Sequence, residues 1–488
     1  MATTSLSYLE PKELWDNFSA LNAVPRPSKK EERVIAFMVE FGTKLGLQTM
    51  QDEVGNVIIK KAATPGMEDR KTIVMQSHLD MVHQKNNATV FDFDTQGIDM
   101  YVDGDWVRAK GTTLGADNGI GVATIMAILA ADNIAHPALE ALFTIDEETG
   151  MTGAMGLKGG LLAGDILLNL DTEEDDHIDI GCAGGIDVTA VGSYQEEASP
   201  AGAIGYEISV KGLHGGHSGI QIDQGFANAN KIMNRILYKS FDNFGLQLSA
   251  LHGGSLRNAI PRESVAKVII SNDYEESFEE EIALLVAEIK AEYKTTDPAM
   301  EITFEKLHTV PAMVMPLENQ LALTRAIYAA HNGVYKMSAE FDNLVETSNN
   351  IAKIVVEQGE IVIQCLTRSS VESSKTDLAN ALSATFELAG YQVELSGSYP
   401  GWTPNATSEI LEVLKSIYVQ QHGEEPKVVA CHAGLECGIL GTNYPEMDMI
   451  SFGPTILGAH SPDERVSISS VQKYWKFVLE ILTQIPKK

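Results

Sequence analysis

The stretch TIVMQSHLDMV, residues 72–82, decides how this sequence is interpreted. Its first half is an apolar run typical of a buried β-strand. The run ends on His78, and Asp80 follows two positions later. Because side chains at i and i+2 share one face of an extended chain, an imidazole and a carboxylate are predicted side by side at the end of a core strand. Such a pair suits a metal site.

Two further buried strands end in acidic residues, and another acid precedes an apolar helical segment. They are Glu147 and Glu148 after ALEALFTI (138–145), Asp171 at the end of DILLNLD (165–171), and Asp117 in GADNGIG. Sites in open α/β sheets form beyond the carboxyl ends of the strands, so we expect these acids to converge near His78. Crowded carboxylates raise one another's pKa, and divalent cations remove that cost. The pattern therefore predicts a two-metal hydrolytic site.

A site of this kind needs a second histidine. His460 in GPTILGAHSPDERV is the candidate, because its Gly/Pro-rich loop follows the strand-like segment MDMISFG. Glu147 and Glu148 are adjacent, so they point in opposite directions in an extended chain. Only one of them can readily face a metal, which leaves the other for proton transfer.

The composition disfavours several classes of partner. The 488 residues include 36 Lys and Arg against 67 Asp and Glu, a formal net charge of −31 at pH 7. This charge repels nucleic acids and anionic membranes. The N-terminal sequence lacks a signal-peptide pattern, and the longest small-apolar stretch, residues 120–131, is too short to span a bilayer. Four scattered cysteines make no disulfide framework, so we expect a cytoplasmic protein.

Short buried strands alternate with helical segments, which predicts an α/β fold with a mostly parallel sheet. The sequence pattern changes between two glycine-rich breaks, GCAGGI (181–186) and SGSYPGWTP (396–404). The segment between them is typical of half-exposed strands and amphipathic helices. We therefore expect a catalytic domain made of residues 1–186 and 397–488. An α+β domain of residues 187–396 is expected to be inserted into it.

Nine segments in order carry a resemblance to a known family. They are HLDMV, RAKGTTLGADNGIG, the EE pair, GCAGGID, KGLHGGHSG, LRNAIPRE, HAGLECG, YPEMDM and GPTILGAHSPDE. The chain resembles the aminoacylase/carboxypeptidase/carnosinase family of dinuclear zinc peptidases, metallopeptidase family 20, and within it the bacterial cytosolic dipeptidases. The resemblance extends essentially from end to end. It implies a zinc-peptidase catalytic domain, with the inserted domain acting as the lid and dimerisation element of a homodimer.

The resemblance also implies roles for the candidate residues. Two zinc ions per chain would be bound by His78 and Asp171, by Glu148 and His460, and by Asp117 as the bridge between them. Glu147 would be the general base, and Asp80 would orient the His78 ring. The peptide bond after Asp117 is expected to be cis, which is rare outside proline. Manganese or cobalt would fit the same ligands.

Three residues of the inserted domain receive roles in substrate binding from the same resemblance. His217, in the GGHSG match, would polarise the scissile carbonyl, either in its own chain's site or across a dimer. Arg368 and Asn258 would bind the free carboxylate of the substrate. Outside that domain, Glu436 in HAGLECG is a candidate for holding a free substrate amine.

The implied reaction is hydrolysis of unblocked dipeptides, including Xaa-His types such as β-alanyl-histidine. A metal-bridging water, activated by Glu147, would attack the peptide carbonyl. A deacylase or carboxypeptidase acting on N-acyl amino acids shares the metal core and is the alternative enzyme. A metal-buffering or scaffold protein is the non-enzymatic alternative, and the presence of Glu147 argues against it because a binder needs no base.

Overall fold

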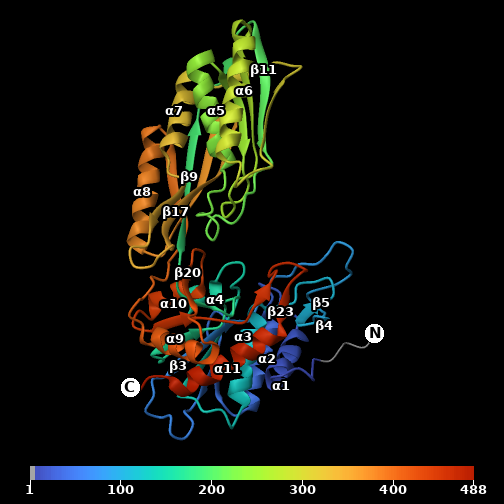
Figure 1. Cartoon of the computed structure of the whole chain (residues 1–488), viewed down its shortest axis with the longest axis vertical. Helices are drawn as coiled ribbons and strands as arrows, with labels where there is room; N and C mark the ends of the chain where they lie inside the picture. The colour runs from blue at the N-terminus through green and yellow to red at the C-terminus, as the bar shows by residue number, and fades with distance from the viewer. Residues whose placement is uncertain (1–5) are drawn as a thin grey trace. The chain divides into compact units, whose positions relative to one another are not determined.

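The structure is a computed structural model that describes residues 6–488. The chain divides into two compact units (Figure 1). The first comprises the residues up to Gly181 together with Trp402–Ala430 and Leu435–Lys488, and the second comprises Cys182–Gly401 and Cys431–Gly434. The second unit extends beyond the expected residues 187–396, because strand β9 already begins at Gly184 and pairs with β19 as far as Tyr399.

The first unit is built on an eight-stranded sheet with the order β1-β2-β6-β3-β7-β21-β8-β20. Its central strands β6, β3, β7 and β21 run parallel. The pairings of β1 with β2, β2 with β6 and β8 with β21 are antiparallel. The expected α/β class is confirmed, but the sheet is mixed, since an apolar run does not specify the direction of a strand. The strands are β1 (Gln48–Gln51), β2 (Val57–Lys61), β3 (Ile73–His78), β6 (Leu139–Thr144), β7 (Ile166–Asn169), β8 (His177–Cys182), β20 (Lys427–Cys431) and β21 (Asp448–Ser451).

Helices and a small sheet complete this unit. Helix α3 is apolar on all sides and packs against β3 and α1, so it forms part of the core. A four-stranded sheet has the order β22-β23-β5-β4. The elements are α1 (Lys12–Asn22), α2 (Glu32–Lys44), α3 (Ala116–Ala130), α4 (Thr152–Gly156), α9 (Glu409–His422), α10 (Glu436–Asn443), α11 (Ile468–Gln484), β4 (Met100–Asp103), β5 (Trp106–Ala109), β22 (Ile456–Leu457) and β23 (Arg465–Ser467).

The second unit contains a nine-stranded sheet with the order β14-β11-β13-β12-β17-β18-β9-β19, and β16 pairs with β17. Helices α5, α6, α7 and α8 lie along its strands (Figure 1) and bury the apolar residues of the sheet. Strands β10 and β15 form a separate pair.

The elements of the second unit have the following bounds. The strands are β9 (Gly184–Ser193), β10 (Glu197–Ala198), β11 (Ala203–Lys211), β12 (Gln247–Gly253), β13 (Ser264–Ser271), β14 (Glu301–Lys306), β15 (Met313–Val314), β16 (Gly333–Met337), β17 (Val345–Glu357), β18 (Glu360–Ser369) and β19 (Gln392–Tyr399). The helices are α5 (Ala229–Phe244), the 3₁₀ turn η1 (Asn272–Tyr274), α6 (Glu275–Glu292), α7 (Leu317–Ala329) and α8 (Glu372–Leu388).

One glycine at the start of β9 is required by close packing. A Cβ on Gly184 would lie 2.4 Å from the backbone nitrogen of Gly401, so only glycine fits where these two segments meet. The glycine-rich break in the sequence therefore marks the first residues of a strand. Across residues 6–488, no helix combines the length and the apolar character needed to cross a bilayer.

Candidate functional site

The carboxyl ends of the parallel strands bring the predicted metal ligands of the first unit together. His78 is the last residue of β3, Asp171 follows β7, and Glu148 follows β6. Ligand atoms of His78, Asp117 and Glu148 all lie within 4.8 Å of one another. Residues far apart in the sequence thus meet at one edge of the sheet, as the strand pattern predicted.

Asp117 lies between two pairs of candidate ligands. Its Oδ1 is 3.0 Å from Nε2 of His78, and its Oδ2 is 3.2 Å from Nε2 of His460. The same His78 nitrogen is 3.5 Å from Oδ1 of Asp171, and the His460 nitrogen is 2.9 Å from Oε2 of Glu148. The two oxygens of one carboxylate therefore face two separate histidine–carboxylate pairs, which is the arrangement that a bridging ligand requires.

The charge balance of this cluster fits divalent cations. Burial raises the pKa of Glu147 well above its usual value, and burial followed by Asp117 raises the pKa of Glu148. Burial and the same Asp117 raise the pKa of Glu173 to about 9. Imidazole nitrogens and carboxylate oxygens are the ligands that zinc takes in hydrolytic sites. Because cations would relieve the mutual repulsion of these carboxylates, the residues present fit a pair of metal ions.

The loop that carries Asp117 is held by a carboxylate that the sequence analysis did not select. Glu464 is buried, and its two oxygens accept the backbone N–H groups of four consecutive residues at 2.7 to 3.3 Å. These residues are Leu114, Gly115, Ala116 and Asp117. The peptide bond between Asp117 and Asn118 is cis, as expected.

Arg26 holds the same loop from the other side. Its guanidinium is buried and donates to the backbone oxygens of Leu79, Asp80 and Gly115. A Cβ on Gly115 would meet this guanidinium at 2.5 Å, and the residue has a φ of +70°. The segment after His78 and the loop before Asp117 are therefore tied together by one side chain.

Asp80 connects the candidate ligand His78 to the two glutamates. Its Oδ1 lies 3.4 Å from Nδ1 of His78, and its oxygens accept the backbone N–H groups of Glu147 and Glu148 at 3.0 and 3.3 Å. A carboxylate at Nδ1 leaves Nε2 free to face the metal cluster. Since Oε2 of Glu148 is the neighbour of His460, Glu147 stays the predicted residue for proton transfer.

In the second unit, His217 lies with Arg368 around the backbone of Gly219. A Cβ on Gly219 would be 3.1 Å from both Cε1 of His217 and Nε of Arg368, and 2.0 Å from the backbone oxygen of His432. The Nδ1 of His217 accepts the backbone N–H groups of Gly219 and Ile220, each at 3.1 Å. Its hydrogen is therefore on Nε2, which is available as a donor.

Burial, more than any nearby charge, keeps His217 neutral. Burial, with Arg368 as the next cause, lowers the pKa of His217 to about 4. Burial and Arg368 also lower the pKa of His432 to about 3, and Nε2 of this second histidine is 2.8 Å from Oγ of Ser348. Arg368 is buried and donates from Nη1 to the hydroxyl of Tyr399 at 2.8 Å, while its Nε has no hydrogen-bond partner among the described residues. This Nε is itself buried, and a guanidinium with an unpaired donor can accommodate a further acceptor.

The structure places the two remaining predicted residues differently. Asn258 is exposed and lies beside the His217 loop, where its backbone oxygen accepts the N–H of Ser218 at 2.8 Å. Glu436 is the first residue of α10 and is 1% exposed. Its Oε2 lies 2.6 Å from the side-chain amide of Gln76 and 2.6 Å from the hydroxyl of Thr144. The amine-binding role of Glu436 stays a prediction, and the structure gives its carboxylate internal partners.

Sequence reasoning missed Glu464, Arg26, Glu173 and His432. Two of them carried a usable signal, because Glu464 is four residues from His460 and His432 begins the HAGLECG segment. Glu173 follows Asp171 in an acidic run that resembles a solvated surface. Arg26 is far from every motif in the sequence, and only the fold brings it to the site.

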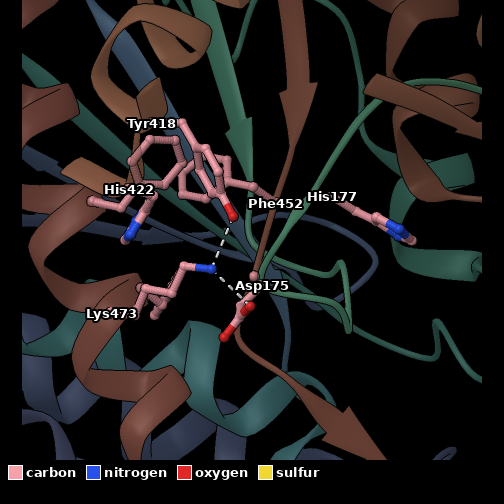
Figure 2. Close-up of a pocket in the computed structure, with 9 residues that line it drawn as sticks. Asp175, His177, Tyr418, His422, Phe452 and Lys473 are labelled. Carbon is pink, nitrogen blue, oxygen red and sulfur yellow. Dashed lines mark hydrogen bonds and ion pairs between the residues drawn. The ribbon is translucent and has the colours of Figure 1, made fainter. Parts of the chain in front are cut away.

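A separate pocket of the first unit is shown in Figure 2. Lys473 donates to Oδ1 of Asp175 and to the hydroxyl of Tyr418, both at 2.9 Å, and His177 and His422 also line the pocket. The only lysine in this lining is thus paired within the pocket, which shares no residue with the metal-ligand cluster. We assign the chemistry to the cluster around Asp117.

Comparison with known families agrees with this geometry. Residues 74–484 match the model of peptidase family M20/M25/M40. The chain belongs to this family. M20 peptidases are metal-dependent hydrolases. The converging histidines and carboxylates are side chains of the kind that can bind the metal of such an enzyme.

Two full-length relatives of this M20 peptidase are dipeptidases. The cytosol non-specific dipeptidase of Escherichia coli (strain K12) is 42% identical over 485 residues, covering 99% of this chain and 100% of the relative. The crystal structure of the aminoacylhistidine dipeptidase from Vibrio alginolyticus is 44% identical, with a TM-score of 0.93, 99% of this chain covered and 98% of that chain. The aminopeptidase PepT from Bacillus cereus shares the fold, with a TM-score of 0.58 and 16% identity over 98% of this chain and 99% of that chain.

Proposed function

We propose that this M20 peptidase is a metal-dependent dipeptidase that hydrolyses the peptide bond of unblocked dipeptides, including Xaa-His types such as β-alanyl-histidine. The observation that carries the proposal is the similarity to two dipeptidases, which are 42% and 44% identical to this chain over 99% of its length. Fold alone would not separate a dipeptidase from a deacylase, because the metal core is common to many peptidases of different specificity. Identity at this level over nearly the whole chain supports a dipeptidase over other members of the family.

Two zinc ions per chain would be held by the ligands of the first unit. His78 and Asp171 would bind one ion, Glu148 and His460 the other, and Asp117 both. The distances around the two oxygens of Asp117 support this division. Bound divalent cations supply Lewis acidity that polarises a carbonyl oxygen and acidifies water, and manganese or cobalt would supply it equally.

Glu147 would act as the general base and then as the general acid. It would remove a proton from the attacking water and deliver that proton to the nitrogen of the leaving amine. Burial and the neighbouring carboxylate of Asp171 raise its pKa, which suits a group that must both accept and return a proton. The carboxylate of Asp80 accepts the backbone N–H of Glu147 and so fixes the backbone from which the Glu147 side chain extends.

The second unit would supply the contacts to the substrate. The Nε2–H of His217 would donate to the carbonyl oxygen as negative charge develops on it. Arg368 would bind the free carboxylate through its guanidinium, and Asn258 beside the His217 loop would add a polar contact. This unit would serve as lid and dimerisation element, with His217 acting in its own chain's site or in that of the partner of a homodimer.

The proposed setting is the cytoplasm, with small dipeptides as the only substrates. The name of the relative from Escherichia coli refers to the cytosol. The net charge of −31 disfavours nucleic acid and anionic membrane as partners.

One substrate comparison tests the proposal. The zinc-loaded protein should hydrolyse β-alanyl-histidine and ordinary dipeptides, and should leave an N-acetyl amino acid intact. Removing the metal with a chelator should abolish the hydrolysis, and adding zinc should restore it. Faster turnover of the N-acetyl amino acid would instead identify a deacylase, and no hydrolysis of either class by fully metal-loaded protein would contradict both.

A further inference from the structure

A row of buried polar side chains crosses the sheet of the first unit beneath the metal ligands. The strand register places Gln76 of β3 opposite Asn169 of β7, Asn169 opposite Ser451 of β21, and Ser451 opposite Asp179 of β8. Gln76 and Asn169 each lie two residues before a candidate metal ligand, His78 and Asp171 respectively. Polar residues in the middle of a core sheet need a physical reason, because burying them without partners is costly.

These side chains form one unbroken hydrogen-bonded chain between two acids. From Asp179 the chain passes through Thr172, Ser451, Asn169 and Gln76 to Glu436. The contact of Asp179 with Thr172 is 2.7 Å, that of Thr172 with Ser451 is 2.8 Å, and that of Gln76 with Glu436 is 2.6 Å. All six residues are buried.

The four residues between the two acids provide one hydrogen too few for the contacts of this chain. Five contacts join the six residues. Each of the two hydroxyls contributes one hydrogen to the chain, and each of the two amides contributes one through whichever end is nitrogen. With both acids ionised, one contact therefore has no hydrogen, whichever way the amides are turned. A proton on one of the two acids completes the chain. With the proton on Asp179, donation runs toward Glu436 and Gln76 donates to it. With the proton on Glu436, the amides of Asn169 and Gln76 are turned and Glu436 donates to Gln76.

The surroundings of the two acids favour Glu436 as the protonated one. Its Oε1 is buried without a hydrogen-bond partner among the described residues, so an ionised Glu436 would leave a charged oxygen unsolvated. Burial raises the pKa of Glu436 to about 8 and that of Asp179 to about 6. The charged groups that act on Glu436 are His78, Asp171, Asp80 and Glu147, and those that act on Asp179 are His177, Glu174 and Asp171.

We propose that Glu436 is a positioning residue that carries the single proton of this chain at neutral pH. Through Gln76 and Thr144 it ties together the ends of β3 and β6, the strands that lead to His78 and Glu147. A neutral Glu436 holds these strand ends without adding a further negative charge to the carboxylates of the metal centre. The kinetic part of the proposal rests on the proposed dipeptidase function, whereas the protonation and the strand geometry do not.

The proton can be observed directly in the metal-loaded protein. A protonated carboxylic acid has an infrared carbonyl band that is separate from the bands of carboxylates. We expect this band at neutral pH in the wild-type protein, its loss in Glu436→Gln, and its retention in Asp179→Asn. Absence of the band from the wild-type protein, or its loss only in Asp179→Asn, would overturn the assignment of the proton.

The positioning role is tested by comparing a neutral isostere with a deletion. If Glu436 holds the strand ends and not a substrate amine, Glu436→Gln should keep kcat within about threefold, because an amide matches the protonated acid in shape and hydrogen bonding. Glu436→Ala should lower kcat on the order of 10- to 100-fold with little change in KM, since small displacements at a reacting centre have effects of this size. Wild-type kcat in Glu436→Ala, or a loss in Glu436→Gln as large as in Glu436→Ala, would contradict the proposal.

A control and a second readout separate this role from general destabilisation. Glu140 is a buried carboxylate of β6 whose Oε1 is 2.6 Å from Nζ of Lys60, so Glu140→Gln should lower thermal stability and leave kcat unchanged. With cobalt as the bound metal, the visible absorption spectrum should change in Glu436→Ala and not in Glu140→Gln. This spectrum reports ligand geometry without any substrate, so it stands even if the protein hydrolyses no dipeptide. An unchanged spectrum in Glu436→Ala would count against the positioning role.

Discussion

The carboxylate of Asp80 accepts the backbone N–H of Glu147 at 3.0 Å. The same oxygen atom lies 3.4 Å from Nδ1 of His78. One buried side chain therefore orients a candidate metal ligand and fixes the backbone of the proposed base. Substitutions that test the base must leave this contact intact, which is why changes confined to the end of the Glu147 side chain are the informative ones.

Replacing Glu147 with Gln should abolish catalysis and leave metal binding intact. The amide keeps the size of the side chain and the backbone contact to Asp80, but it cannot accept a proton at neutral pH. We expect turnover to fall by ~10²–10⁴ or more, with metal content near two ions per chain by elemental analysis. Glu140→Gln, a change of the same type on β6, is the control and should stay active. A Glu147→Gln protein with most of its activity would rule out the general-base role.

Asp117 and His460 should differ in what their loss does to the metal pair. A bridging carboxylate neutralises charge on two cations held ~3.5–4 Å apart, so Asp117→Ala should empty or scramble both sites. His460→Ala should mainly weaken one site. Metal titrations of the two variants distinguish these outcomes. Two full sites in Asp117→Ala would show that this carboxylate does not bridge.

Arg368→Lys should impair recognition of the substrate's C-terminal carboxylate. A guanidinium can bind a carboxylate through two N–H groups, whereas an ammonium is a single point charge. Hydrolysis of ordinary dipeptides should therefore weaken strongly, and hydrolysis of their C-terminal amides should change little. Arg235→Lys on α5, which removes an exposed pair with Glu292, is the matched control. Equal losses on acid and amide substrates would contradict this role for Arg368.

His217→Ala should lower turnover by ~10²–10³ if its Nε2–H stabilises the developing oxyanion. Thermal stability and metal content should not change. The alternative is that His217 only holds its own loop, through the N–H groups that its Nδ1 accepts. In that case stability would fall together with activity, so a thermal unfolding curve separates the two roles.

Subunit mixing tests whether His217 acts within one chain. If His217 of the partner subunit completes each site, mixing inactive Glu147→Gln and inactive His217→Ala subunits should restore part of the activity. Some mixed dimers would then pair an intact base with an intact histidine. No recovery after subunit exchange has been verified would assign His217 to the site of its own chain.

His432 should make the second unit sensitive to mild acid. Burial and Arg368 lower its pKa to about 3, below its usual value of about 6.5. Between these two pH values the unfolded chain binds more protons than the folded chain, so the free energy of unfolding falls as the pH decreases. We expect His432→Gln to be less stable than wild type near pH 7 but to lose less stability down to about pH 5. Parallel stability curves for the two proteins would exclude this role.

The convergence of three proposed metal ligands could be expected from the sequence, because each of the three follows an apolar strand. Parallel neighbours share an edge, so His78, Glu148 and Asp171 had to meet there. The sequence could not reveal the chain from Asp179 to Glu436. Its members become neighbours only because β21, from the C-terminal part of the chain, lies between β7 and β8. Arg26 was hidden for the same reason, since no local pattern specifies a contact between segments distant in the sequence.

The position of Glu464 has a consequence for the order in which the protein is made. Its carboxylate holds the backbone around Asp117, and His460 comes from the same loop, yet both residues follow the whole second unit in the sequence. A ribosome releases the N-terminal segments first. The whole second unit is therefore synthesised before the residues that complete the metal centre emerge. The N-terminal segments therefore carry an incomplete set of candidate ligands until the chain that follows the second unit has been made.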